Sequence, residues 1–127
     1  MALFAKLLLL ITGLFFFGSD AGGQDLNFIK RLNTARSDTM RASIYREAIR
    51  HYSRRNIDSV KYYGELGIAY FRRHKEPIFE AQVMEQMALV DDNQGRTNTA
   101  HERTQYALNI YRQLNYKPGI ASAVGNM

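Results

Sequence analysis

Apolar residues recur at intervals of three and four along the chain from about position 38, and this spacing most limits what the chain can fold into. It is the spacing of one face of an α-helix, and it differs from the alternation of a β-strand. We predict helices over about 38–52, 58–75, 77–93 and 97–114, and a fifth that begins at Pro118. Because the gaps are only a few residues long, consecutive helices should lie antiparallel as hairpins. The sequence therefore predicts an all-α fold.

The predicted helices repeat with a period of about 40 positions, as two-helix repeats do. The segment KEPIFEAQV at 75–83 matches YKPGIASAV at 116–124 at an offset of 41. The second helices match at an offset of 40, with Gly67 over Ala107, so we predict that one residue is gained in a turn. Repetition of a two-helix unit of this length is the signature of a solenoid.

The segment Met1–Ala21 has the proportions of a signal peptide. Lys6 precedes an apolar run, Leu7–Phe17, and small residues follow at Ser19 and Ala21. The run is well short of the roughly 20 residues that cross a bilayer as a helix. We therefore predict cleavage after Ala21 and a protein exported to the periplasm or the extracytoplasmic side of the membrane. The alternative is an uncleaved anchor over 2–18, which Lys6 would interrupt.

The remaining residues divide into two parts. We expect a polar lead-in at 22–37 and helical repeats over 38–127, with repeats at about 38–75 and 76–116 and an incomplete one at 117–127. Because the last segment would begin a hairpin without its second helix, we expect the chain to be a fragment that folds only marginally. The alternative is that this helix is an atypical terminal cap.

Composition excludes several kinds of chemistry. The chain has no Cys, which rules out disulfides, zinc–thiolate sites and thiol nucleophiles. Its charge is uneven, because Lys30–Lys75 holds twelve Lys and Arg against four Asp and Glu. In a cytosolic protein this would suggest a nucleic acid, but for an exported segment we expect none. A solvated outer face is the simplest interpretation, and an anionic surface or acidic ligand stays open.

Residues 81–111 resemble the tetratricopeptide repeat (TPR). Small residues at helix crossings carry the resemblance, together with a glycine that opens the turn between the helices. Met84, Asp91 and Thr104 stand where the family pattern has Trp, Tyr and Phe. The resemblance implies a short, right-handed solenoid of stacked antiparallel hairpins. The positions to which it assigns a packing role are Gly67, Ala88, Gly95, Ala100 and Ala107.

The segments at 58–71 and 115–126 look like the long variant of these repeats, which is common in exported sensory proteins. The resemblance implies a non-enzymatic scaffold that binds a protein or peptide, as the sensory part of a signalling protein with a histidine kinase or helix-turn-helix output. The alternative is a free periplasmic adaptor. A membrane would be involved only through an uncleaved N-terminal anchor or a missing C-terminal part. The ligand groove that the resemblance implies is formed by Gln82, Glu85, Leu89, Asp92 and Asn93.

We identify no catalytic or metal-binding pattern. HERTQ at 101–105 places Gln105 where a zinc-protease helix needs its second His. The His residues lie on three different predicted helices. Asp91 and Asp92 point about 100° apart, which does not converge two carboxylates on one substrate, and we expect them to end a helix. We therefore expect no enzyme activity, no metal and no cofactor. We expect most tyrosines of the second helices to pack in the core.

Overall fold

The computed structural model describes residues 22–127, and the predicted signal peptide lies outside the described residues. Regular structure in the described part is entirely helical, which confirms the all-α prediction. No helix within residues 22–127 combines the length and apolar character needed to cross a bilayer. The helices are α2 (Gly22–Thr34), α3 (Asp38–Tyr52), α4 (Ile57–Arg73), α5 (Pro77–Asn93), α6 (Thr97–Gln113) and α7 (Lys117–Gly125).

Helix α2 belongs to one compact unit, and residues 35–127 form another. Periodicity did not predict α2, because its described side chains include few apolar residues. Phe28 and Leu32, one turn apart, are both buried. The segment expected as a polar lead-in is therefore largely helical.

The last four helices of the second unit, α4 to α7, begin at a constant interval. α4, α5 and α6 have the same length, and each is followed by a connection of the same length. The first residues of α4 to α7 are therefore evenly spaced, at 57, 77, 97 and 117. The predicted gain of one residue is wrong, because α7 follows α5 at the same interval at which α6 follows α4. Pro77 is the first residue of α5, whereas Pro118 is the second of α7.

The constant interval follows from three turns of the same kind. Each contains one residue with a left-handed backbone: Lys75 (φ 55°), Gly95 (φ 79°) and Asn115 (φ 51°). The next residue donates its N–H to a carbonyl five positions earlier, as Tyr116 does to Tyr111 at 2.8 Å. This is a Schellman motif, which satisfies carbonyl groups that a helix end would leave unpaired.

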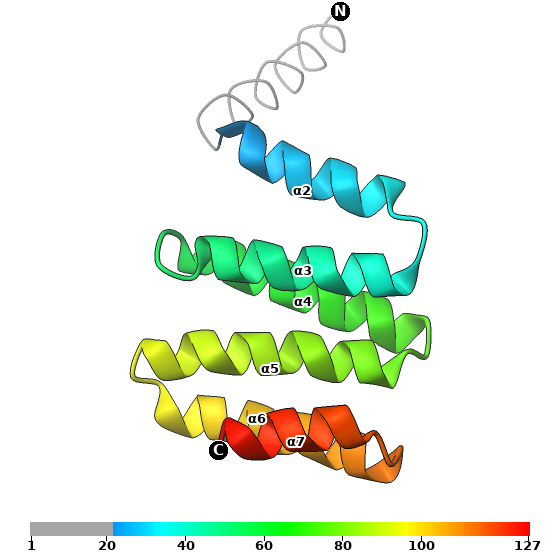
Figure 1. Cartoon of the computed structure of the whole chain (residues 1–127). Coiled ribbons are helices and arrows are strands. Elements are labelled where there is room, and N and C mark those ends of the chain that lie inside the picture. The colour runs from blue at the N-terminus through cyan, green and yellow to red at the C-terminus, as the bar shows by residue number, and fades with distance from the viewer. Residues whose placement is uncertain (1–21) are drawn as a thin grey trace, which may run out of the picture. The chain divides into compact units, whose positions relative to one another are not determined.

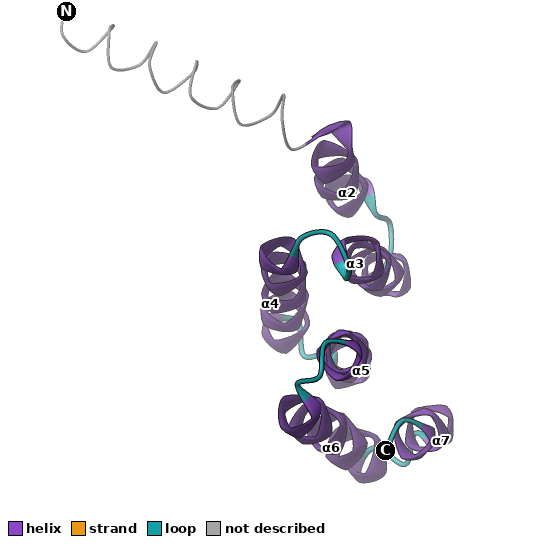
Figure 2. Cartoon of the chain, turned by 90° about the vertical axis from the view of Figure 1, so that its left-hand side faces the viewer, coloured by secondary structure: helices purple, strands orange, loops and turns teal. Residues whose placement is uncertain are grey.

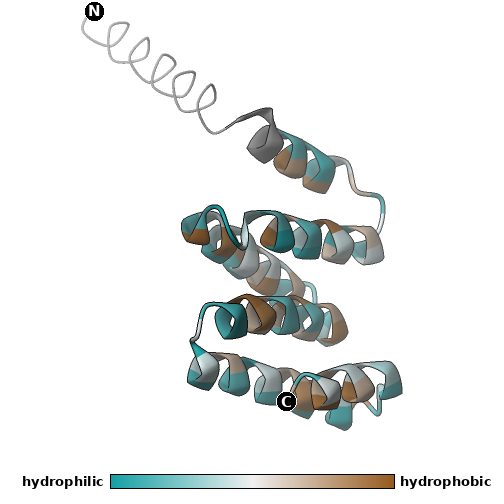
Figure 3. Ribbon diagram, turned by 60° about the vertical axis from the view of Figure 1, so that its left-hand side comes forward, coloured by the Kyte–Doolittle hydropathy of each residue, from teal (hydrophilic) through white to brown (hydrophobic). Residues whose placement is uncertain are grey.

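The hairpins form two layers. α3 pairs with α4 and α5 with α6, while α3 also packs beside α5 (Figure 1). The end-on view shows α3, α5 and α7 on one side and α4 and α6 on the other (Figure 2). The side-chain amide of Gln94 donates to the carbonyl of Ser53 at 2.9 Å and ties the α5–α6 turn to the α3–α4 turn. Apolar residues alternate with hydrophilic ones along each of these helices (Figure 3), and every helix of the unit contributes hydrophobic residues that are buried.

Small residues occur where helices approach closely. Ala88, Ala100 and Ala107 are buried, and Gly95 provides the left-handed turn. A Cβ on Gly67 would lie 3.0 Å from Cγ of Tyr45. All five predicted packing positions are therefore buried in the unit or lie at a turn.

Two details differ from what the spacing predicts. Helix α4 begins at Ile57, one residue before the predicted start, because Asn56 caps it and accepts the Ser59 N–H through its side chain at 3.2 Å. Met40 is apolar and lies in the helix predicted over about 38–52, yet it is 48% exposed.

The tyrosines of α4 and α6 divide between core and surface. Tyr63 and Tyr111 are buried, but Tyr62 and Tyr106 are exposed. Tyrosine tolerates both environments, so its spacing alone did not separate them.

Candidate binding groove

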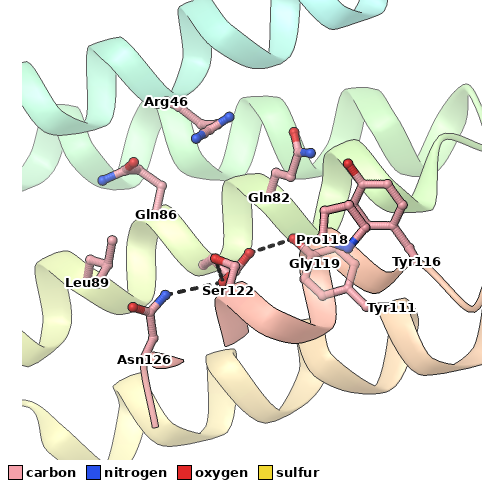
Figure 4. Close-up of a pocket in the computed structure, with 11 residues that line it drawn as sticks. Arg46, Gln82, Gln86, Leu89, Tyr111, Tyr116, Pro118, Gly119, Ser122 and Asn126 are labelled. Atoms are coloured by element: carbon pink, nitrogen blue, oxygen red, sulfur yellow. Dashed lines mark hydrogen bonds between the residues drawn. The ribbon is translucent and has the colours of Figure 1, made fainter. Parts of the chain in front are cut away.

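A hollow of about 170 Å³ lies between α5 and α7, and Arg46 of α3 also contributes to its lining (Figure 4). We call it the groove. Most of its lining comes from the α3, α5 and α7 side of the unit. Its lining residues are Arg46, Gln82, Glu85, Gln86, Leu89, Tyr111, Tyr116, Pro118, Gly119, Ser122 and Asn126.

The floor of the groove holds a buried carboxylate. Glu85 is 8% exposed, and its Oε2 accepts a hydrogen bond from the hydroxyl of Tyr111 at 2.6 Å. Its Oε1 accepts from Ser122 at 2.9 Å and from Asn126 at 3.3 Å. A buried charge is costly unless hydrogen bonds replace its lost water. Glu85 therefore ties α6 and α7 to α5.

The pKa of Tyr111 reflects this environment. Burial of the hydroxyl raises the pKa above the ordinary tyrosine value, and the hydrogen bond to Glu85 and that carboxylate's negative charge raise it further. The positive charge of Arg46 acts in the opposite direction. Tyr111 thus stays protonated at neutral pH and remains a hydrogen-bond donor to Glu85.

Close packing places α7 against Tyr111. A Cβ on Gly119 would lie 2.4 Å from Cδ1 of the Tyr111 ring, a separation that real atoms do not adopt. The ring is fully buried and also contacts the Tyr116 ring, with 5.7 Å between centroids. Gly119 therefore allows α7 to close one end of the groove.

The five predicted groove residues lie in different places. Gln82, Glu85 and Leu89 line the groove. Asp92 lines a smaller neighbouring hollow, of about 70 Å³, to which Leu89 also contributes. Asn93 is the last residue of α5 and is exposed. The first three thus lie together, because a period of three and four keeps them on one helix face.

Sequence reasoning missed the partners from other helices. Arg46 of α3 is half-buried, and its side chain forms no hydrogen bond or ion pair with residues 22–127. Gln86 and the α7 residues Ser122 and Asn126 complete the walls. Only the tertiary arrangement brings them together. A signal for α7 was present, however, since Ser122 and Asn126 are spaced to share one helix face.

The described residues offer a surface for recognition. No group of three or more His, Cys, Asp or Glu side chains within residues 22–127 is arranged to hold a metal ion. The groove instead presents the amide of Gln82, the apolar side chain of Leu89 and the cation of Arg46, with the amide of the largely buried Gln86 beside them. Such a surface can exchange hydrogen bonds with an amide backbone and cover an apolar side chain.

Comparison of the chain with protein-family models, with curated proteins and with solved structures finds no match. The resemblance to tetratricopeptide repeats therefore depends on the residues and turns described above.

Proposed function

We propose that this chain is a non-enzymatic scaffold of the tetratricopeptide type, and that its groove holds an extended segment of a partner protein. Three features support the repeat assignment. The helices from α4 to α7 begin at a constant interval, and each of the three turns between them has a residue with a left-handed backbone at the same position. Small residues lie at the helix crossings. Repetition of one supersecondary unit is what defines a repeat array.

The composition of the groove is the observation that carries the proposal. Glu85 already accepts hydrogen bonds from three neutral side chains, so it is committed to holding the helices together. Arg46 forms no hydrogen bond or ion pair with residues 22–127, and its cation and the half-buried amide of Gln82 are available to a ligand. Gln86 also lines the groove but is only 8% exposed. An extended peptide offers alternating N–H and C=O groups along its length, which amide side chains can pair with.

The cellular context is part of the same proposal. The apolar run at 7–17 supports export, which would place the groove on the extracytoplasmic side as the sensory region of a signalling protein. A free periplasmic adaptor is the alternative. The sequence of the gene after Met127 separates the two, because a sensor requires a membrane helix and an output domain downstream.

Selection from a phage-displayed random-peptide library on the full-length chain tests peptide binding. We expect enrichment of peptides whose affinity falls at least tenfold in Leu89→Lys, because that substitution adds a cation to the lining that holds Arg46 and removes apolar contact. Leu66→Lys is the matched control, since Leu66 of α4 is 39% exposed and Leu89 is 40% exposed. Failure to enrich any peptide, or equal weakening by both substitutions, would contradict the proposal.

A further inference from the structure

A third hollow lies among α4, α5 and α6, and we call it the lateral hollow. It measures about 370 Å³ and shares no lining residue with the groove. Small-molecule sites in proteins typically measure about 300–1,000 Å³, so its size suits a small ligand. Its lining residues are Ile57, Val60, Lys61, Met87, Asp91, Arg96, Thr99 and Arg103.

One part of the lateral hollow is apolar. Ile57 and Val60 lie in the first turns of α4, and Met87 lines the hollow from α5. Val60 and Met87 are almost completely buried, so they belong to the protein core and form a fixed floor. Together with Ile57, which is half-buried, this floor favours an aliphatic group, because the apolar surface of the ligand itself leaves water on contact.

The remainder of the lining is cationic. Lys61, Arg96 and Arg103 contribute three positive charges, and Asp91 is the one acidic side chain of the lining. Asp91 accepts from Arg96 through Oδ1, at 2.9 Å from Nε and 2.7 Å from Nη2. Its Oδ2 lies 2.8 Å from Nε of Arg103. One carboxylate thus neutralises one charge, and two positive charges remain.

Arg103 is poorly satisfied by its protein neighbours. Its Nε forms an ion pair with Asp91, but the atom is buried and lacks a hydrogen bond of good geometry. Its Nη1 lies 3.5 Å from Sδ of Met87 and 3.7 Å from Sδ of Met84, and thioethers are weak acceptors. Lys61 is exposed and forms no hydrogen bond or ion pair with residues 22–127. Two cationic side chains therefore have donors to offer.

We propose that the lateral hollow binds a small amphipathic anion, in which a carboxylate or phosphate head group is joined to an aliphatic chain. The head group lies at Lys61 and Arg103, and the chain covers Ile57, Val60 and Met87. An inorganic anion would make no contact with the apolar part of the hollow, and a neutral aliphatic molecule would leave the cations unpaired. Charge-assisted hydrogen bonds to a head group are roughly twice as strong as neutral ones. This inference is independent of the proposed function.

Titration of the ¹⁵N-labelled full-length chain with octanoate, followed through amide chemical shifts, tests the inference. We expect saturable shifts concentrated at 57–61, 87–91 and 96–103. Octyl phosphate should bind at the same residues, which would show that the head group is recognised by its charge. Acetate, inorganic phosphate and octan-1-ol should each bind at least tenfold more weakly, because each lacks one half of the ligand.

Two substitutions locate the site. Lys61→Gln should weaken octanoate binding about fivefold, whereas Lys117→Gln, which removes an exposed cation from α7, should leave it unchanged. Thr99→Glu should abolish binding, because it adds a negative charge to the lining. A preserved amide spectrum shows that each variant is folded. The inference would be overturned if octan-1-ol or inorganic phosphate bound as tightly as octanoate, or if the shifts lay outside the hollow. Unchanged octanoate binding by Lys61→Gln and Thr99→Glu would also overturn it.

Discussion

Replacement of Gly119 by Ala should loosen α7 from the rest of the second unit. The new methyl group would lie 2.4–2.6 Å from three atoms of the Tyr111 ring, so either the ring or α7 must move. The ring is fully buried and held by its hydrogen bond to Glu85. Helix α7 packs mainly on α6, so we expect α7 to shift. Its shift would break the bonds from Ser122 and Asn126 to Glu85.

Two opposing contributions determine the size of the effect. Inserting a methyl group into a well-packed site typically costs about 1–3 kcal/mol. Ala is favoured over Gly within a helix by about 1 kcal/mol, which offsets part of that cost. The difference between these contributions lowers the free energy of unfolding of Gly119→Ala by up to about 2 kcal/mol.

Urea denaturation monitored by circular dichroism measures this change, and amide hydrogen exchange shows whether protection is lost first in α7. Gly125→Ala is the control on the same helix, because a Cβ at Gly125 would meet no atom within 4 Å and the substitution should not destabilise. If Gly119→Ala is as stable as the parent and α7 keeps its protection, the close packing of Gly119 on Tyr111 is refuted.

Three further predictions follow from the turns and buried groups. Stability should fall as pH rises above about 10, because the unfolded chain then loses the Tyr111 proton while the folded state, with its raised pKa, retains it; urea midpoints at about pH 9 and pH 11 should show a smaller fall in Tyr111→Phe, and an unchanged fall would refute this. Gly95→Ala should lower the free energy of unfolding by about 1 kcal/mol, because the φ of 79° at Gly95 is left-handed, although no atom would touch the added Cβ. Lys75→Gly, at the equivalent turn position, should instead stabilise the protein, and thermal melting compares the two variants. Asp91→Asn should lower the free energy of unfolding by about 2 kcal/mol, because it leaves Arg103 unpaired. Asp92 is exposed, so Asp92→Asn should change the free energy of unfolding by less than about 0.5 kcal/mol. Equal urea midpoints for these two variants would count against the ion pairs of Asp91 with Arg96 and Arg103.

Helix positions could be predicted from sequence because their ends carry strong local signals. Pro77 begins α5, and Gly95 provides the left-handed turn after it, so the prediction for 77–93 agrees with the structure. The start of α4 was less certain, because Asn56 and Asp58 both have side chains that can accept a backbone N–H and so cap a helix, and the helix begins at Ile57 rather than at the predicted 58. The predicted helix ends were therefore accurate where a residue such as Pro or Gly favours one backbone conformation at that position.

Contacts between helices were less predictable. Sequence position suggests that Asp91 ends a helix, yet it is buried and paired with Arg96 and Arg103. The left-handed turn at Gly95 brings Arg96 back to Asp91, a geometry that residue spacing does not reveal. In the same way, the contribution of Arg46 to the groove depends on how α3 packs beside α5.

Chemical-shift mapping of a selected peptide on the ¹⁵N-labelled full-length chain tests the binding-scaffold proposal most directly. We predict the largest saturable changes at Gln82, Gln86 and Leu89 on α5 and at Ser122 on α7. Changes concentrated on the exposed faces of α4 and α6, with none in the groove, would contradict it.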